Sequence, residues 1–199
     1  MPINIYAVKH PLIFTWINHL IHNKPQQGDT YELIYKIHLT LIYEACRKTI
    51  QHYNLYIKYI DHINQIWLIK NNKIHIFCTD NISTAISKDI LYIIPKTTIH
   101  NINLQEKNNN WSISHENNFS HQITANSQIV IIEEELLANR INSILNYINA
   151  KDLINTTIQI CCTHCDSTEL DKLGQQYSQL DVYTAYITNT LSEKQMIRR

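Results

Sequence analysis

The sequence predicts an α/β protein with a mainly parallel central sheet flanked by helices. Compact apolar runs, typical of strands buried on both faces, occur at residues 74–78, 129–132, 156–162 and 182–188. Segments with apolar residues at helical spacing accompany these runs along the chain. Strands that alternate with helices usually form a parallel sheet covered on both faces. We therefore expect the four strands to be neighbours in one sheet.

The first third of the chain is predicted to be mainly helical. Residues 11–22 carry apolar side chains at helical spacing, and Pro11 is tolerated in a first turn. Asp29 and Glu32 form a variant capping box, which opens a second helix through about residue 50. Residues 54–70 show no clear period and are predicted to be irregular, with short strands at most.

The middle of the chain continues with one helix and one strand. Residues 81–92 are predicted to be helical, and Pro95 ends that helix. A strand is expected from Thr97 onward. The Asn-, Ser- and His-rich stretch at about 105–128 indicates a polar excursion or a flexible hairpin.

The last third supplies two further helices between its strands. They are predicted at residues 136–149 and 167–173, with Gly174 as the cap of the second. There is no internal repeat and no obvious linker. We therefore expect a single domain over residues 1–199, with an amino-terminal helical hood at about 1–53.

Composition narrows the classes of partner. The chain has 199 residues with 17 basic and 17 acidic side chains, so its net charge is zero. This balance gives no electrostatic reason to expect nucleic acid or an anionic membrane as a partner. No apolar run approaches the roughly 20 residues of a membrane span. The first residues also lack the charged and apolar regions of a signal peptide.

Residue bias indicates a compartment. Isoleucine, asparagine, lysine and tyrosine have AT-rich codons and are well represented, whereas glycine occurs only twice. Such a bias is typical of an AT-rich genome, for example that of an organelle. The five cysteines are odd in number and unevenly spaced, which favours a reducing compartment. We expect the plastid stroma or otherwise the cytoplasm, and not secretion.

Several local patterns have an ordinary structural explanation. Cys162 and Cys165 have the spacing of half a zinc or redox site, but no second ligand pair accompanies them, so we interpret them as packed thiols. His19 and His22 lie three residues apart on the first helix, a spacing expected by chance among 11 histidines. No catalytic residues and no metal ligands can be named from spacing alone.

The acidic stretch at residues 133–135 is less ordinary. It lies between an apolar strand and a helical pattern, at the kind of junction where many α/β proteins bind a phosphate. Phosphate loops need glycine for close backbone approach. Here the junction has three glutamates and no glycine, so we interpret it as a solvated acidic helix start rather than a metal site.

Three segments resemble the uracil phosphoribosyltransferases, which are type I phosphoribosyltransferases. The first helices carry a His-Pro-Leu-Ile start and a Tyr-Glu-Ala-x-Arg end, matched by Tyr43, Glu44, Ala45 and Arg47. Residues 129–148 occupy the place of the loop that binds phosphoribosyl pyrophosphate (PRPP). Residues 170–197 are similar to the penultimate strand-and-turn region. The resemblance implies a phosphoribosyltransferase-type, Rossmann-like fold and a divergent, degenerate member.

This sequence departs most strongly from the family at the loop that binds PRPP. The family sequence there is Asp-Pro-x-Leu-Ala-Thr-Gly-Gly-Ser/Thr, whose acid contacts the ribose hydroxyls and whose amides wrap the phosphate. The aligned positions run from Glu133 to Ile141, so both glycines and both hydroxyl residues are replaced. Glu133 can stand in for the acid, and Arg140 is a candidate compensating charge. The vestigial binding positions are Glu133, Glu134, Leu137, Ala138, Asn139, Arg140 and Ile141.

Other family motifs are altered too. The pyrophosphate turn, Pro-Ile-Leu-Arg-Ala-Gly, is matched by residues 78–83, which contain neither arginine nor glycine. A Phe-Arg pair of the early helix is replaced by Tyr31 and Glu32. The sequence ends at Arg199, near where the family's uracil-binding segment would begin, so we expect no nucleobase site. The family would use Mg-PRPP, and we expect no cofactor here.

The resemblance implies an inherited reaction, in which uracil and PRPP give UMP and diphosphate in pyrimidine salvage. We expect that catalysis is lost and that a binding or regulatory role remains. A divergent active enzyme, completed by another subunit, and a small-ligand sensor that uses the remnant cleft stay open as alternatives. The family usually pairs subunits, and the first helices carry Phe14, Trp16, Tyr31 and Tyr35, so we expect a homodimer. A further protein partner is left open.

Overall fold

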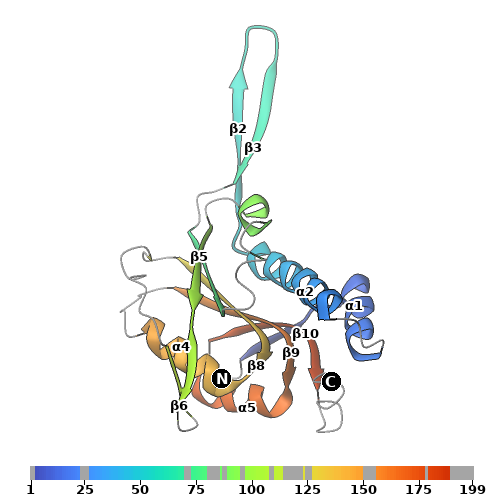
Figure 1. Cartoon of the computed structure of the whole chain (residues 1–199). Helices are drawn as coiled ribbons and strands as arrows, with labels where there is room; N and C mark the ends of the chain where they lie inside the picture. Colours follow the sequence, from blue (N-terminus) through green and yellow to red (C-terminus); the bar gives the residue numbers. More distant parts are fainter. Residues whose placement is uncertain are drawn as a thin grey trace.

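The computed structural model describes residues 3–22, 27–69, 73–79, 86, 89–94, 97–107, 110–113, 123, 127–149, 156–177 and 179–188. Strands and helices alternate through most of this chain (Figure 1). The strands are β1 (Asn4–Ala7), β2 (His52–Lys58), β3 (Ile63–Ile69), β4 (Ile74–Thr79), β5 (Thr97–Ile102), β6 (Leu104–Lys107), β7 (Asn110–Ile113), β8 (Gln128–Leu136), β9 (Thr157–Asp166) and β10 (Asp181–Thr188). The labelled helices are α1 (Pro11–His22), α2 (Gln27–Arg47), α4 (Ala138–Asn149) and α5 (Ser167–Gln176).

Six strands form one parallel sheet in the order β1-β10-β9-β8-β4-β5. The four strands expected to be neighbours are consecutive in this order, so the predicted parallel sheet is confirmed. Their sequences are apolar without alternation because helices cover both faces of the sheet. Strand β1 was not predicted, since it is short and lies at an edge, where it pairs only with β10.

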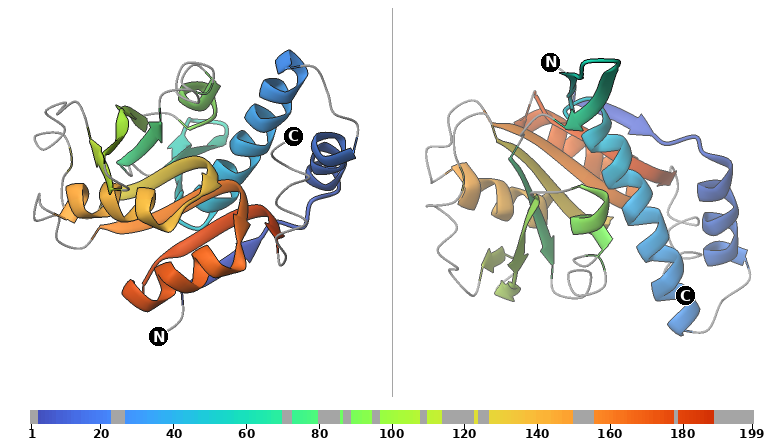
Figure 2. Two further views of the ribbon diagram at one scale, coloured as in Figure 1. Left: turned by 60° about the horizontal axis from the view of Figure 1, so that its bottom comes forward. Right: turned by 90° about the horizontal axis from the view of Figure 1, so that it is seen from above.

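Two hydrophobic cores lie on opposite faces of the sheet. Along β8, Ile129 and Ile131 pack into the core that α4 and α5 cover. Val130 and Ile132 alternate with them and pack into the core under α1 and α2 (Figure 2). Ile129, Ile131 and Ile132 are fully buried, and truncating one of them to alanine would cost about 2–5 kcal/mol. These two cores fix the helices over the sheet.

The helix boundaries differ from the predictions in two places. Helix α2 begins at Gln27, so Asp29 lies inside its first turn and does not precede it. Helix α5 continues through Gly174 to Gln176, where the Tyr177 N–H donates to the Leu173 carbonyl. The predicted glycine cap was therefore wrong. At the other end of α5, the Asp166 carboxylate accepts from the Thr168 N–H at 2.8 Å and caps the helix.

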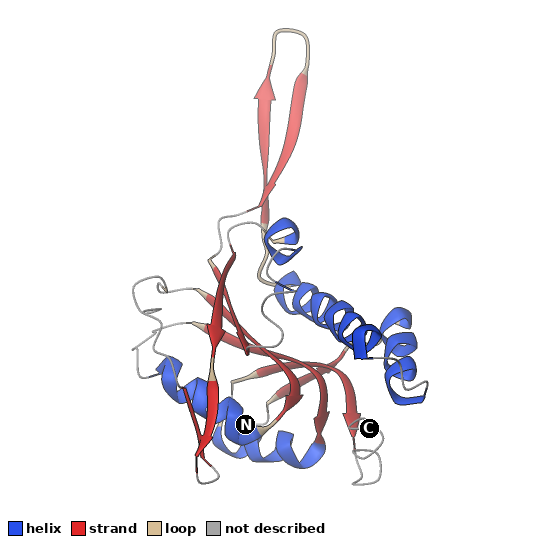
Figure 3. Cartoon of the chain, viewed as in Figure 1, coloured by secondary structure: helices blue, strands red, loops and turns tan. Residues whose placement is uncertain are grey.

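Residues 52–69 form a long two-stranded hairpin, not the irregular segment that was predicted. Strands β2 and β3 pair antiparallel over seven residues each, from His52 opposite Ile69 to Lys58 opposite Ile63. The hairpin projects away from the rest of the molecule (Figures 1 and 3). Its apolar residues do not alternate strictly, because both faces of the hairpin are largely exposed, and the sequence pattern was therefore weak.

The other middle elements agree in part with the predictions. Strand β5 begins at Thr97 as expected, and β6 and β7 form a short antiparallel hairpin within the polar stretch. Residues 89–93 are helical, whereas most of the predicted helix at 81–92 lies outside the described residues. Among the helices that the structure describes, none has an apolar stretch long enough to cross a bilayer.

Candidate functional site at the carboxyl edge of the sheet

The strand order changes direction between β4 and β8. The chain passes from β4 to β5 on one side, and β8 then lies on the other side of β4. Ligands of open α/β sheets bind at such a switch point, outside the carboxyl ends of the strands. Thr79 ends β4, and Glu133 lies on β8 just past the residue paired with Cys78. The candidate site is therefore this carboxyl edge.

The acidic residues lie on a strand and not in a loop. Strand β8 continues through Glu133, Glu134 and Glu135 to Leu136, and β9 pairs with it along this length. The predictions ended the strand at residue 132 and began the helix at 136, and both boundaries were wrong. Glutamate has low strand propensity, but the ladder to β9 outweighs that preference. Only Leu137 separates β8 from α4.

The vestigial loop positions are consequently split between two regular elements. Glu133 is buried on β8 and Glu134 is exposed. Ala138, Asn139, Arg140 and Ile141 form the first turn of α4, where Ala138 and Ile141 are buried in the core. A junction of one residue leaves no run of loop N–H groups that can wrap a phosphate.

A carboxylate of the protein itself occupies the amino terminus of α4. The Ala138 N–H donates to Glu169 Oε2 at 2.8 Å, and Lys172 Nζ lies 2.6 Å from Glu169 Oε1. Helix amino termini attract anions because their first N–H groups are unpaired and the helix dipole is positive there. Glu169 thus holds the position where an anionic ligand would bind. Sequence reasoning missed it, because the Asp166-x-x-Glu169 spacing assigns this glutamate to its own helix.

Glu133 and Arg140 form a buried ion pair beside that cap. Arg140 Nη2 lies 3.0 Å from Glu133 Oε2, and the Glu133 side chain is only 2% exposed. Burial raises the pKa of Glu133 to about 7, while the Arg140 charge and the Thr79 hydroxyl act in the opposite direction. The Arg140 guanidinium also stacks 4.9 Å from the Trp111 ring centroid. Arg140, the one arginine among the positions aligned with the PRPP loop, therefore contacts Glu133 and Trp111.

His38 completes the network from helix α2. Its Nε2 lies 3.1 Å from the Glu133 carbonyl oxygen and 3.0 Å from Thr163 Oγ1. A carbonyl oxygen only accepts, so this nitrogen carries the proton. Burial lowers the pKa of His38 to about 4, which keeps the ring neutral near pH 7. His38 and Thr163 carried no recognisable sequence signal, because 125 residues separate them.

Comparisons with known proteins find relatives over part of the chain. No protein-family model matches the chain. It is 32% identical over 79 residues to a uracil phosphoribosyltransferase homologue of Pyropia yezoensis, covering 39% of this chain and 40% of that protein. A protein described in the same words, from Porphyra purpurea, is 31% identical over 72 residues, which are 36% of each chain. The aligned regions thus span well under half of both relatives.

A solved structure shows the fold over a greater length. The AQ2163 protein of Aquifex aeolicus superposes with a TM-score of 0.75 at 12% identity, over 92% of this chain and 86% of that one. Over the aligned residues the chain is similar to these two uracil phosphoribosyltransferase homologues, from which it has diverged widely. Its mainly parallel central sheet with flanking helices is the α/β fold that the sequence predicted.

The other positions that resemble altered family motifs lie in part outside the described residues. Cys78 and Thr79 end β4, whereas residues 80–83 of the pyrophosphate turn and residues 195–199 are not described. In α2, Glu32 pairs with Lys36 at 2.6 Å on the exposed surface. The side chain that replaces the family's arginine is thus engaged within its own helix.

The remaining candidate residues have structural surroundings. All five cysteines are free and buried, as predicted for packed thiols. Burial raises the pKa of Cys46 and Cys78 to about 12, and a hydrogen bond from Cys162 lowers that of Cys165. His19 and His22 lie in the last turn of α1. Within the described parts of the chain, no three His, Cys, Asp or Glu side chains come together as a metal site.

Proposed function

We propose that this uracil phosphoribosyltransferase homologue does not catalyse phosphoribosyl transfer and acts instead by binding or regulation. One observation carries the proposal: the one-residue β8–α4 junction, whose helix amino terminus is capped by Glu169. A second carboxylate, that of Glu133, forms an ion pair with Arg140, so this arginine is not available to a phosphate. The place of the family's phosphate loop thus supplies negative charge and few free donors.

The negative charges at the carboxyl edge oppose the binding of PRPP, which is itself an anion. Two like unit charges about 4 Å apart repel by roughly 4 kcal/mol at an effective dielectric of 20. A 5′-phosphate at the α4 amino terminus would have to displace Glu169 or lie beside it. Magnesium would screen part of this repulsion but would not restore the missing backbone donors. We therefore propose that neither PRPP nor Mg-PRPP is a cofactor of this protein.

Calorimetric titration of PRPP with magnesium into the purified protein tests the proposal, followed by an assay for labelled UMP from uracil. We expect no saturable heat and no UMP above the blank. Micromolar PRPP binding together with UMP formation would establish the divergent active enzyme. PRPP binding without UMP would instead establish a small-ligand sensor that uses the remnant cleft.

We also propose that the protein is a homodimer, held in part by the β2–β3 hairpin. The strand register places Tyr53, Leu55, Ile57, Ile66 and Leu68 on one face of the hairpin, which we call the apolar hairpin face. Tyr53, Leu55 and Ile66 are exposed. A lone two-stranded hairpin is marginally stable in water, and an exposed apolar patch of this kind usually has a partner.

The same chain offers a surface that can receive this hairpin. Leu91, Tyr92 and Ile93 are exposed on the short helix at residues 89–93. Phe14 and Tyr31 of the first helices are also exposed, whereas Trp16 and Tyr35 are half-buried. In a two-fold dimer each copy supplies both surfaces, so every hairpin can be covered at once.

Sedimentation equilibrium with one matched pair of variants tests the dimer. Leu55→Lys places a charge on the apolar hairpin face and is expected to give a monomer at tens of micromolar. Gln105→Lys adds the same charge at an exposed position of β6, outside the hairpin, and should leave the dimer intact. A wild-type protein that sediments as a monomer would overturn this part of the proposal.

The plastid stroma is the compartment we propose. The amino-acid composition is typical of an AT-rich genome, and the two relatives come from the red algae Pyropia yezoensis and Porphyra purpurea. Neither nucleic acid nor a membrane is proposed as a partner, since the net charge is zero. Fractionation of organelles followed by immunoblotting checks the assignment, and signal confined to the cytoplasm would contradict it.

A further inference from the structure

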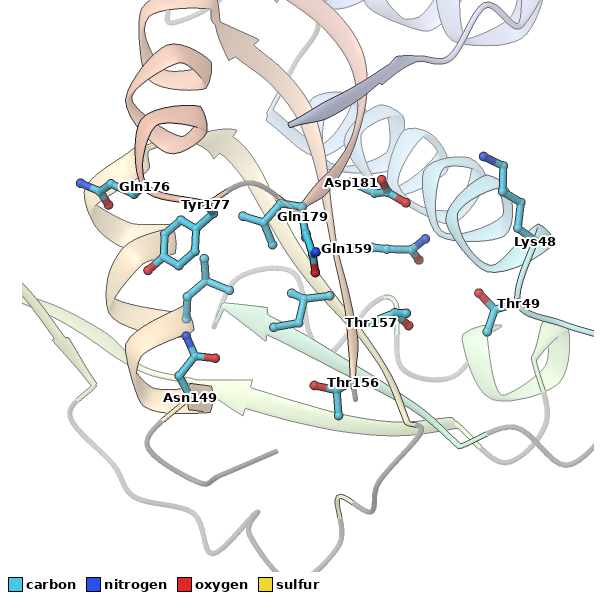
Figure 4. Close-up of a pocket in the computed structure, with 13 residues that line it drawn as sticks. Lys48, Thr49, Asn149, Thr156, Thr157, Gln159, Gln176, Tyr177, Gln179 and Asp181 are labelled. Carbon is cyan, nitrogen blue, oxygen red and sulfur yellow. The ribbon is translucent and has the colours of Figure 1, made fainter. Parts of the chain in front are cut away.

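A cavity lies at the opposite, amino edge of the sheet. It has a volume of about 570 Å³ and lies where β9 and β10 begin and where α2, α4 and α5 end (Figure 4). We call it the amino-edge pocket. This volume falls within the range of about 300–1,000 Å³ that is usual for small-molecule sites. The described residues at its walls come from five separate elements and their ends.

The polar groups of the amino-edge pocket are mostly uncharged. Four amide side chains line it, and so do hydroxyl groups of three threonines and a tyrosine. The amides belong to Asn149, Gln159, Gln176 and Gln179. An amide offers both donors and acceptors, and a hydroxyl does the same. The pocket therefore matches a ligand that also carries both kinds of group.

The two charged residues at the pocket wall are engaged with strand β1 and its neighbours. Lys48 Nζ lies 4.5 Å above the Tyr6 ring centroid and 3.4 Å from the Tyr6 hydroxyl. Asp181 Oδ1 accepts a hydrogen bond from Asn4 Nδ2 at 2.9 Å. Neither charge lacks a partner, so the pocket has no single charge that would select an ion.

Apolar groups form the rest of the wall. Leu145, Ile158 and Leu180 line the pocket, and each also packs in or against the core beneath α4 and α5. Tyr177 adds an aromatic ring to this side (Figure 4). A sugar ring has an apolar face of C–H groups and a rim of hydroxyls, which would meet these two kinds of wall together.

We propose that the amino-edge pocket binds an uncharged small molecule with a hydroxyl-bearing sugar ring, as found in nucleosides and glycosides. This inference is independent of the proposed loss of catalysis. The carboxyl edge contains Glu133 and Glu169, and the amino-edge pocket shares no residue with it. Either proposal can fail while the other stands.

Protein-observed NMR with two probes tests the site. Uridine and methyl β-glucoside are titrated separately, up to about 10 mM, a range that detects millimolar affinity. We expect saturable shifts for at least one probe at the amides of Thr157, Gln159 and Tyr177, and none at Ala138 or Arg140. Uridine alone would assign a nucleoside, and methyl β-glucoside a glycoside. Absence of saturable shifts with both probes would overturn the proposal.

Two matched variants separate the pocket from the rest of the protein. Asn149→Trp fills the pocket from the exposed end of α4, and we expect it to weaken probe binding at least tenfold. Asn146→Trp makes the same exchange at an exposed position of that helix that does not line the pocket, and it should leave binding unchanged. Equal binding by both variants would contradict the site. UMP provides a last check, because tighter binding of UMP than of uridine there would contradict an uncharged ligand.

Discussion

The two edges of the central sheet differ in what surrounds their polar side chains. At the carboxyl edge, Glu169 caps α4, Glu133 pairs with Arg140, and His38 bonds to Thr163. At the amino edge, amides and hydroxyls line a cavity of about 570 Å³, although Gln159 also pairs there with Gln128. In a parallel α/β sheet the carboxyl edge is where ligands usually bind. Here that edge is filled with contacts inside the chain.

The contrast bears on the proposal that the carboxyl edge no longer serves catalysis in this protein. Both cores run along the length of the strands, so the fold has support besides the polar contacts at the carboxyl edge. A charged group placed at that edge must nevertheless find a partner, since an unpaired buried charge is costly. The internal pairs are thus expected to stabilise the protein, and four predictions test that expectation from the largest effect to the smallest.

The largest effect is expected from Arg140→Ala. It leaves Glu133, which is only 2% exposed, without its counter-charge. Removing one partner of a buried ion pair costs about 3–5 kcal/mol, and urea unfolding at pH 9, above the folded pKa of Glu133, measures this loss. Arg47→Ala is the matched control, because its pair with Glu44 lies at the surface and is worth less than about 1 kcal/mol. Equal losses in the two variants would refute the importance of the buried pair.

The same variant has a pH signature. The pKa of Glu133 in the folded protein is raised to about 7. A group with a raised folded pKa binds its proton more tightly when folded, so its stabilising contribution is present at low pH and is lost as pH rises through about 7. The deficit of Arg140→Ala should therefore shrink at pH 5, where Glu133 is protonated. Adding Glu133→Gln should remove most of the deficit at pH 9.

His38 should give the next largest effect. Burial lowers its pKa to about 4, below the ordinary value of 6.5. The unfolded chain then binds the proton more tightly, so stability is full above pH 6.5 and falls as pH drops toward 4. The loss is on the order of 3 kcal/mol, at 1.36 kcal/mol per pKa unit. Urea unfolding from pH 7 to pH 4.5 measures it.

His38→Gln separates this contribution from the other titrating groups. Its amide can donate to the Glu133 carbonyl but does not titrate. We expect the variant to lose less stability than the wild type over the same pH range. His100, whose pKa burial also lowers to about 4, remains in both proteins and cancels in the comparison. Identical pH profiles would show that His38 does not set the acid sensitivity.

The sheet could be predicted from the sequence, whereas most contacts at its carboxyl edge could not. The apolar runs at residues 74–78 and 129–132 predicted the sheet correctly, because burial on both faces requires such runs. The carboxyl edge could not be predicted in the same way. Glu133 pairs with Arg140 seven residues later, but Glu169 reaches Ala138 from another helix, and His38 meets Thr163 across 125 residues. Contacts of that kind depend on strand order.

Local propensity failed where tertiary pairing decided the outcome. Three consecutive glutamates favour a helix start, yet the pairing of β8 with β9 holds them in a strand. Gly174 is a natural helix cap, yet α5 continues past it, because Leu170 and Leu173 bury that helix against the core. The hairpin at residues 52–69 was missed because both of its faces carry exposed apolar residues, so polar and apolar residues do not alternate clearly along its strands.

A buried amide pair at the amino edge should give the third effect. Gln128 Nε2 donates to Gln159 Oε1 and lies 3.5 Å from the Ala45 carbonyl, and both side chains are buried. Gln159→Leu removes the main acceptor and leaves the Gln128 amide poorly satisfied, which costs about 1–3 kcal/mol. Replacing both glutamines by leucine should cost less than the single change. A double variant that loses the sum of both single changes would contradict the pairing.

The smallest effect, and the sharpest test of the comparison, is expected at Glu169. Glu169→Ala removes the carboxylate that accepts from the Ala138 N–H at 2.8 Å, and the loss of a helix cap costs about 1 kcal/mol. Glu169→Gln keeps an oxygen acceptor there and should lose less. Lys172→Ala removes the partner of Glu169 while leaving the cap, which separates the surface ion pair from the capping bond. If Glu169 stands where an anion would bind, sulfate should raise the stability of Glu169→Ala more than that of the wild type, because only the variant has a vacant helix amino terminus. Urea unfolding with sulfate or chloride at equal ionic strength measures that difference. An identical response of both proteins to sulfate would show that Glu169 acts only as a helix cap and does not replace a bound anion.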